Sequence, residues 1–372
     1  MQKEHIVYFT NLYPLPWEPA RAAYNKQIVS ALRMHCDVDV LTPVPAPVWF
    51  RQLLKGKLKN SEATLFPFFF LPGFGRRTYA LTLFISMLLC VYPLVRLIRA
   101  KHIVASWAYP EGVVASLFKK WGNRKVAIHC VGTDINYHFR HSARQKQMLR
   151  AFDRADEVIT VSRDLAGKIV PLATASTRCN VVYNGVSFDK FTLSDATTHS
   201  KSFLYIGNLL TTKGVYELAS AAALLKARGL DFTLDIVGKG PESDKLKAQI
   251  SSDNLDDIVT FHGAVLHDDI PALLAKARAL VLPSYREGVP NVIMESLAAG
   301  VPPVATAVGG IPEIVRDGEN GILVRELNAS TLADAMQKAL EKDWDNAALR
   351  HSVSEYTWEN CAQGFLSALS IR

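Results

Sequence analysis

Short apolar runs, bounded by Gly, Pro or polar residues, alternate along the first half of the chain with segments of helical periodicity. Continuous apolar runs of this length are typical of strands that are covered on both faces, as in parallel sheets. Apolar residues recur every three or four positions in 24–34 and 112–120, which predicts helices there. Strands that alternate with helices predict right-handed βαβ units. The predicted strands of this half are 5–10, 37–43, 101–106, 125–130, 156–162 and 179–185.

A polar segment rich in Ser, Thr and Asp, 189–201, interrupts this pattern and reads as a linker between domains. A second series of β-α units follows it, and the last twenty residues have the periodicity of an amphipathic helix. The predicted fold class is therefore α/β, with two doubly wound, Rossmann-like parallel-sheet domains that face a central cleft. We expect an N-terminal domain in 1–188, a C-terminal domain in 202–352, and a helix in 353–372 that returns to the N-terminal domain. The strands predicted for the second series are 202–208, 232–238, 258–263, 279–284, 302–307 and 321–324.

Charge is distributed unevenly between the two halves. The formal net charge is +7, but residues 1–190 hold 26 Lys and Arg against 12 Asp and Glu, whereas the remainder holds 16 against 23. This asymmetry indicates an anionic partner for the first half. An anionic membrane surface fits better than a nucleic acid, because no nucleic-acid-binding module accompanies the basic residues. A solvated basic face without a partner is the alternative.

The segment 79–95 has no charged residue over 17 positions and is flanked by arginines. At ~1.5 Å per residue a helix of this length would reach about 26 Å, short of the roughly 30 Å hydrocarbon core of a bilayer. We predict a buried or half-buried helix, with a helix in the membrane interface and a true span as alternatives. Five scattered cysteines and a first segment that does not read as a signal peptide favour a cytoplasmic protein, peripheral on the inner membrane face.

The strongest chemical signal is a pair of glutamates eight positions apart within 285–324. Glu287 is predicted on a loop after the strand that ends at Ser284, and Glu295 about one turn into the helix 291–299. The free N–H groups and the dipole at the start of that helix suit a phosphate. Two carboxylates that flank an anion site match a ligand with hydroxyls on both sides of a phosphate, such as a nucleotide sugar.

This segment resembles the nucleotide-sugar signature of glycosyltransferase family 4, retaining enzymes of the GT-B fold. The resemblance covers nearly the whole chain. The segments 205–218, 234–246 and 181–191 are similar to the family's phosphate-binding loop, Gly-x-Gly turn and interdomain junction. In the first half, 107–118 and 129–136 resemble members that build bacterial surface polysaccharides.

The resemblance implies a role for each matching residue. Glu287 would contact hydroxyls of the donor sugar and Glu295 the ribose, while Lys213 would neutralise the departing diphosphate. Backbone groups at Gly288, Val289, Pro290 and Asn291 would hold the distal phosphate, and Val265 would line the base. The other positions implied at the donor site are Gly207, Asn208, Gly238 and Gly240. In the first domain, Asp134 and His129 are the candidates for catalytic residues.

Three positions depart from the family pattern. Asn208 stands where an Arg is frequent, five residues before Lys213, and Ala22 stands where the first loop often has Gly. Val131 occupies the place of a His or Arg before Gly132. The sequence leaves two roles open for His129, two residues earlier on the same strand face: a substitute for that residue or a core histidine.

The resemblance implies that a sugar is transferred from a UDP or GDP sugar, the donor substrate, with retention of configuration. It implies neither a metal ion nor a cofactor. No Asp-x-Asp stands at the end of a predicted strand where it would hold a metal. The expected product is a bacterial cell-surface polysaccharide, made on a lipid-linked or glycan acceptor. The alternatives are a nucleotide-sugar epimerase of the same fold and a catalytically inactive glycosyltransferase-like subunit. A dinucleotide oxidoreductase is disfavoured because no G-x-G-x-x-G opens the first β-α turn.

Overall fold

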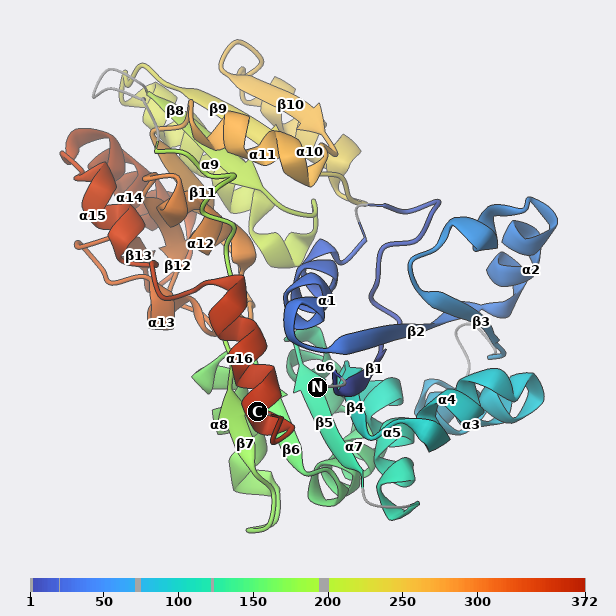
Figure 1. Cartoon of the computed structure of the whole chain (residues 1–372). Coiled ribbons are helices and arrows are strands. Elements are labelled where there is room, and N and C mark those ends of the chain that lie inside the picture. The colour runs from blue at the N-terminus through green and yellow to red at the C-terminus, as the bar shows by residue number, and fades with distance from the viewer. Residues whose placement is uncertain (1–2, 20, 71–74, 122–123, 194–200, 372) are drawn as a thin grey trace. The chain divides into compact units, whose positions relative to one another are not determined.

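The computed structural model describes residues 3–19, 21–70, 75–121, 124–193 and 201–371 (Figure 1). The chain divides into two compact units, Met1–Asn184 together with Trp358–Arg372, and Gly185–Thr357. The division falls after Asn184, whereas the sequence places it after residue 188. Residues 185–188, which the sequence assigns to the first domain, and 189–193 of the predicted linker group with the second unit. Residues 194–200 lie outside the described residues. The C-terminal helix α16, Trp358–Ala368, belongs to the first unit.

The first unit is built on a seven-stranded parallel sheet in the order β3-β2-β1-β4-β5-β6-β7. All six strands predicted for this half are confirmed. Its strands are β1 His5–Phe9, β2 Asp37–Pro45, β3 Thr64–Phe68, β4 His102–Ser106, β5 Lys125–Cys130, β6 Glu157–Thr160 and β7 Cys179–Val181. Its helices are α1 Ala23–His35, α2 Ala46–Leu54, α3 Tyr79–Cys90, α4 Tyr92–Arg99, α5 Val113–Leu117, α6 Thr133–Asn136, α7 Ser142–Arg154, α8 Arg163–Ile169 and α16.

Two hydrophobic layers cover the faces of this sheet, because side chains alternate along each strand. On β1, Ile6 and Tyr8 pack in the layer that contains residues of α1 and α16, which lie side by side in Figure 1. Val7 and Phe9 pack in the opposite layer, with residues of α3, α5 and α7. The continuous apolar strands of the sequence are thus explained by burial on both faces.

The sequence analysis missed strand β3. Its residues pair with β2, with Pro67 opposite Val44. A proline cannot donate a ladder hydrogen bond, so it is tolerated in an edge strand, where one side has no neighbour. β3 is the edge of the sheet. Of the apolar residues in 64–70, those up to Phe68 therefore belong to the sheet, and Phe69 after them is exposed.

The segment 79–95 is not the single helix that the sequence predicts. α3 ends at Cys90 and α4 begins at Tyr92, and the two helices are bent by 101°. Val91 between them has a φ of 55°. Pro93 lacks the N–H that would continue α3. No single helix in the described part of the chain is long and apolar enough to cross a membrane, although this bent pair has the required length and composition together.

The second unit has a six-stranded parallel sheet in the order β10-β9-β8-β11-β12-β13. All six predicted strands are confirmed, and the predicted helix 291–299 is α12. The strands are β8 Ser202–Ile206, β9 Thr233–Val237, β10 Val259–Gly263, β11 Ala279–Leu282, β12 Pro303–Thr306 and β13 Ile322–Val324. The helices are α9 Val215–Ala227, α10 Ser243–Ser252, α11 Ile270–Leu274, α12 Asn291–Ala298, α13 Ile311–Ile314, α14 Ala329–Glu341 and α15 Asn346–His351.

The backbone conformation of Ala22, in the first loop, leads to a testable prediction about stability. It precedes α1 with φ 46° and ψ 47°, in the left-handed region that glycine occupies without strain. We expect Ala22→Gly to raise the thermal midpoint, because relief of about 1 kcal/mol of backbone strain exceeds the entropy that glycine adds to the unfolded chain. Ala31→Gly, inside α1, is the matched control and should lower the midpoint. A decrease for both variants in differential scanning calorimetry would contradict the prediction.

Candidate functional site

The candidate site lies at the carboxyl edge of the second sheet, where the strand order reverses. β8 and β11 are neighbours, but the chain leaves β8 for β9 on one side and β11 for β12 on the other. In such sheets, ligands bind outside the carboxyl ends of the strands at this switch point. The loops 207–214 and 283–290 leave the sheet here, and they carry most of the residues predicted for the donor site.

Glycines allow the loops at this edge to pack backbone against backbone. Gly214, in the left-handed region at φ 66°, precedes α9, and a Cβ there would lie 1.9 Å from the Pro283 carbonyl oxygen. Such a contact is far closer than any side chain tolerates. The same loops are joined by hydrogen bonds between backbone groups, such as Tyr285 N–H to Thr212 O at 2.9 Å. Three more glycines approach a neighbouring carbonyl oxygen to within about 2 Å at an added Cβ: Gly238 that of Gly207, Gly240 that of Leu209, and Gly309 that of Glu287.

Lys213 and Glu287 meet across these two loops. The Lys213 ammonium donates to Glu287 Oε1, and the two side chains are 23% and 10% exposed. Tyr205 lies buried on β8, and its hydroxyl donates to the Asn208 carbonyl oxygen at 3.0 Å. Burial and the Glu287 charge hold the pKa of Tyr205 well above its ordinary value. The structure therefore brings together a cation and an acid that lie 74 positions apart in the sequence.

The N-terminus of α12 follows directly on this pair. Gly288, Val289 and Pro290 lead from Glu287 into the helix, and Gly288 O accepts from Gly310 N–H at 2.7 Å. The residue before the helix, Pro290, makes no side-chain hydrogen bond to its first turn. The first N–H groups of a helix and its dipole favour an anion. The arrangement can bind a phosphate beside Lys213.

Glu295 lies one turn further along α12 and is 8% exposed. Its Oε1 is 2.8 Å from His267 Nε2, on the loop that follows β10 and Val265. The hydrogen bond with Glu295 raises the pKa of His267 above its ordinary value, against the opposing effect of burial. The sequence analysis did not find His267, since it lies in no motif and meets Glu295 only through the fold. Gly309 lies inside the segment 285–324, but its close approach to the Glu287 carbonyl appears only in the fold.

Asp134 in the first unit is fully buried, and its carboxylate binds backbone N–H groups. Its carboxylate accepts from the N–H groups of Gly132 at 2.9 Å, Ala108 at 3.1 Å and Ile135 at 3.1 Å, with a longer contact to Val131. It thereby ties the loop after β4 to the loop after β5. These contacts describe a positioning residue.

His129 does not lie where the sequence analysis expects a substitute for Val131. It is fully buried on β5, its ring packs edge-on against Phe365 of α16 at 5.0 Å, and Nδ1 is 3.1 Å from Ser106 Oγ. Burial lowers the pKa of His129 to about 3. Val131 instead packs against the opposite hydrophobic layer, because the strand ends at Cys130 and the alternation of faces is lost there. The expectation of a shared face is wrong.

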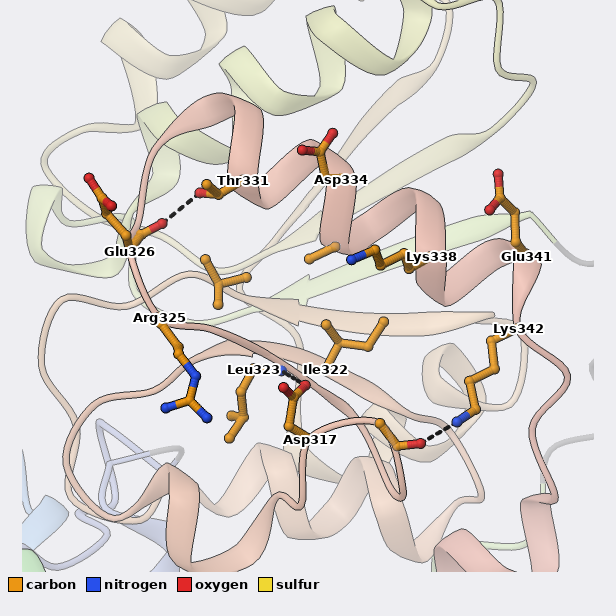
Figure 2. A pocket seen from close by; sticks show the side chains of 13 residues that line it. Asp317, Ile322, Leu323, Arg325, Glu326, Thr331, Asp334, Lys338, Glu341 and Lys342 are labelled. Carbon is orange, nitrogen blue, oxygen red and sulfur yellow. Dashed lines mark hydrogen bonds between the residues drawn. The ribbon is translucent and has the colours of Figure 1, made fainter.

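A cavity of about 790 Å³ in the second unit involves none of these residues. It is lined by β13 and α14, with charged side chains of both signs, including Arg325, Asp334 and Lys338 (Figure 2). Asp317 on its wall accepts from Leu323 N–H at 2.9 Å and so holds the edge strand. Volume alone thus does not identify the site. Within the described ranges, no group of three His, Cys, Asp or Glu is arranged to hold a metal ion.

The chain is similar in sequence and in fold to proteins named as glycosyltransferases. Residues 191–359 match the family described as Glycosyl transferases group 1. The chain is 29% identical over 266 residues to the putative colanic acid biosynthesis glycosyltransferase WcaL of Salmonella typhimurium, and the match covers 69% of this chain and 65% of WcaL. The match therefore spans slightly less than two thirds of that relative.

Solved structures with the same fold cover nearly the whole chain. Sucrose-phosphate synthase from Thermosynechococcus elongatus superimposes with a TM-score of 0.78 at 20% identity, over 98% of both chains. HepE of Anabaena in complex with UDP superimposes with a TM-score of 0.75 at 20% identity, over 99% of both chains. The fold is that of the GT-B glycosyltransferases, as the sequence predicts.

The His267–Glu295 pair makes a pH-dependent contribution to stability. Because the pKa of His267 is raised in the folded protein, this contribution is complete below the ordinary value of 6.5 and is lost as the pH rises through the raised value. We expect His267→Gln to lower the thermal midpoint more at about pH 5.5 than at about pH 8.5. Adding Glu295→Gln should cause little further loss at the lower pH. An equal loss at both pH values would mean that the pair is not charged.

Proposed function

We propose that this protein, whose residues 191–359 match the family of group 1 glycosyl transferases, transfers a hexose-type sugar from a UDP or GDP sugar to a lipid-linked or glycan acceptor, with retention. The product would be a bacterial cell-surface polysaccharide. The observation that carries the proposal is the Lys213–Glu287 pair beside the start of α12, at the switch point of the second sheet. A nucleoside-diphosphate sugar needs a cation and helix N–H groups at its phosphates and an acceptor at its sugar hydroxyls, and all three meet here. The resemblance to WcaL, which is named for colanic acid biosynthesis, supports the product class.

Each side chain then has a separate task. Lys213 and the start of α12 balance the charge that develops on the leaving diphosphate, so that no metal is required. Glu287 accepts hydrogen bonds from hydroxyls of the donor sugar. Glu295, held by His267, accepts from the ribose. Because Lys213 is a cation and Glu287 an anion, their variants should differ in their effects on nucleotide binding and on sugar transfer.

The chemical step follows from this arrangement. The bond between the anomeric carbon and the β-phosphate oxygen breaks, and a bond from the acceptor oxygen to the anomeric carbon forms on the same face. The acceptor proton passes to the leaving phosphate oxygen. No protein nucleophile takes part, and the protein contributes position and electrostatic stabilisation.

We expect Lys213→Met and Glu287→Ala to differ in their effects on nucleotide binding. Lys213→Met removes the cation and should weaken UDP or GDP by tenfold or more in calorimetry, while the affinity for the free nucleoside changes little. Glu287→Ala removes a negative charge beside the phosphate site, so nucleotide binding should be equal or tighter. Transfer by Glu287→Ala should nevertheless fall at least tenfold in kcat/KM, or about 1.4 kcal/mol of transition-state stabilisation.

The matched control is Lys226→Met, which breaks the ion pair of Lys226 with Asp257 in the same unit and should change neither quantity. If Lys213→Met weakens nucleoside and nucleotide equally, Lys213 does not contact phosphate. Release or isomerisation of the sugar without an acceptor would favour an epimerase. Tight donor binding without any reaction would favour an inactive subunit.

We further propose that the first unit docks on an anionic membrane, where a lipid-linked acceptor would be presented. α3 is apolar on both faces: Ala80, Leu83 and Met87 are buried, whereas the opposite side is exposed. We call this exposed side the α3 apolar face; it consists of Leu81, Ile85, Leu88 and Leu89, between 42% and 69% exposed. An exposed apolar face of this kind is typical of an interaction surface.

The neighbouring segments carry further exposed apolar residues and exposed positive charge. Phe69 N–H donates to Ser86 Oγ of α3, and the Phe69 ring lies 6.4 Å from that of Phe50 on α2. Leu54 at the end of α2 is 89% exposed. The exposed basic residues next along the chain are Lys55, Lys57 and Lys59. Basic residues beside an apolar face are the combination that anionic bilayers bind.

Vesicle sedimentation tests this docking. We expect binding to vesicles of phosphatidylglycerol and phosphatidylcholine, little binding to phosphatidylcholine alone, and only partial release by high salt, because part of the binding is apolar. Ile85→Asp with Leu89→Asp should abolish it. Val170→Asp with Leu224→Asp, which replaces exposed apolar residues elsewhere, should not. Equal binding to both kinds of vesicle, or to neither, would remove the membrane from the proposal.

A further inference from the structure

A second polar cavity lies within the first unit, at the carboxyl ends of β1 and β4. These neighbouring strands form the switch point of the first sheet, since the chain leaves them in opposite directions. The cavity has a volume of about 370 Å³. The polar residues of its wall are Asn11, Arg21, Arg76, Trp107, His138 and Arg144. Three arginines and no acid face this space among the described residues.

Arg144 is the main anomaly. It is only 6% exposed, and no carboxylate of the described residues lies within ion-pair distance of it. Its guanidinium donates to His138 Nδ1 at 2.6 Å and lies 5.9 Å from the centre of the Tyr109 ring. A buried charge is costly unless an opposite charge and hydrogen bonds compensate it. The chain itself supplies hydrogen bonding and an aromatic face here, but no negative charge.

The other charged groups around the cavity leave the charges of Arg144 and Arg76 without an opposite charge. Burial and Arg144 lower the pKa of His138 to about 4, so the ring is neutral at pH 7 and accepts from Arg144. Arg76 is exposed and has no ion pair in the described part of the chain. Arg21 pairs with Glu18 at 2.9 Å. Burial raises the pKa of Glu111, the buried acid nearby, to about 8, which keeps it largely protonated at neutral pH.

Two further polar groups on the wall have no partner. Asn11 Oδ1 and Trp107 Nε1 are buried and make no hydrogen bond in the structure. Trp107 also has a φ of 106°, which is strained for any residue with a side chain. Strain of this kind is maintained at functional sites when it positions a side chain for a ligand. One acceptor and one N–H donor beside three guanidinium groups suit a ligand that carries both an anion and a hydroxyl.

We propose that this cavity binds a phosphate group of the acceptor, next to the sugar or alcohol that carries it. Planar guanidinium groups match the oxygens of a phosphate, and Arg144 and Arg76 supply them from two elements of the first unit. Asn11 and Trp107 then contact the adjoining hydroxyl group. This inference rests on the proposed function in naming the ligand an acceptor, but the binding of phosphate does not depend on it.

The source of the phosphate separates two acceptor classes. Tyr79, the first residue of α3, also lines the cavity, so a phosphate bound here would lie at the start of the α3 apolar face. A lipid-borne phosphate therefore fits as well as a soluble sugar phosphate. Farnesyl diphosphate serves as the probe for the lipid source and glucose 1-phosphate for the soluble one.

Calorimetry on the full chain carrying Lys213→Met tests the proposal, because that background removes the cation of the donor site. We expect at least one probe to bind, and Arg144→Gln to weaken it tenfold or more. Arg76→Gln, at an exposed position that should not affect folding, should weaken it several-fold. Arg140→Gln, an exposed arginine that does not line the cavity, is the matched control and should have no effect.

The outcomes distinguish this inference from the proposed function. Binding of neither probe, or binding that Arg76→Gln and Arg144→Gln leave unchanged, would overturn the phosphate site, even if the wild-type protein binds and uses a nucleotide sugar. Phosphate binding that depends on Arg144 and Arg76, in a protein that binds no nucleotide sugar, would support the site and overturn the proposed function. Preference for farnesyl diphosphate over glucose 1-phosphate would identify the lipid source.

Discussion

The close approach of loop backbones at the carboxyl edge of the second sheet determines where the functional side chains of that unit lie. Gly214 touches the Pro283 carbonyl and Gly309 the Glu287 carbonyl, at distances that leave no room for a Cβ. Because these contacts fix the loops after β8, β11 and β12 relative to one another, Lys213 and Glu287 can meet. A side chain at either glycine would force the loops apart by more than an ångström and separate the ion pair. The glycines therefore act through geometry rather than through ligand contact.

The sheets of the two units share the same order of strands around the switch point, but the units differ in whether their buried charged side chains are paired. In the second unit, the cation and the acids of the candidate site are paired, Lys213 with Glu287 and His267 with Glu295. In the first unit, Arg144 is buried beside a neutral histidine without an acid. Ion pairs of the first kind can be exchanged for contacts with a ligand, whereas the second arrangement calls for an anion from outside. The excess of basic residues in 1–190 has the same sign.

Buried polar residues of the first unit hold the loops that line the cavity with Arg21, Arg76 and Arg144. Asp134 satisfies backbone N–H groups from the loops after β4 and β5, and one of these groups belongs to Ala108, next to Trp107. A carboxylate that accepts several N–H bonds in the interior is a strong constraint on the backbone, because any displacement leaves a buried charge unsatisfied. The hydrogen bond from the neighbouring Ala108 N–H to Asp134 thus helps to hold the strained backbone conformation of Trp107. His129 packs against Phe365 of α16, in the hydrophobic layer that also contains residues of α1.

The sequence by itself determined the twelve strands it predicts, the two parallel sheets and the loop that holds Glu287, since apolar runs, helical periodicity and Gly and Pro punctuation are local properties. It did not reveal β3, whose proline is acceptable only because the strand lies at a sheet edge. It also placed His129 and Val131 on one face, although the strand ends between them. The pairing of Glu295 with His267 and the isolation of Arg144 were decided by the tertiary structure alone. Both depend on which residues distant in the chain come within a few ångströms, and on how much water burial removes, and neither quantity is encoded in local pattern.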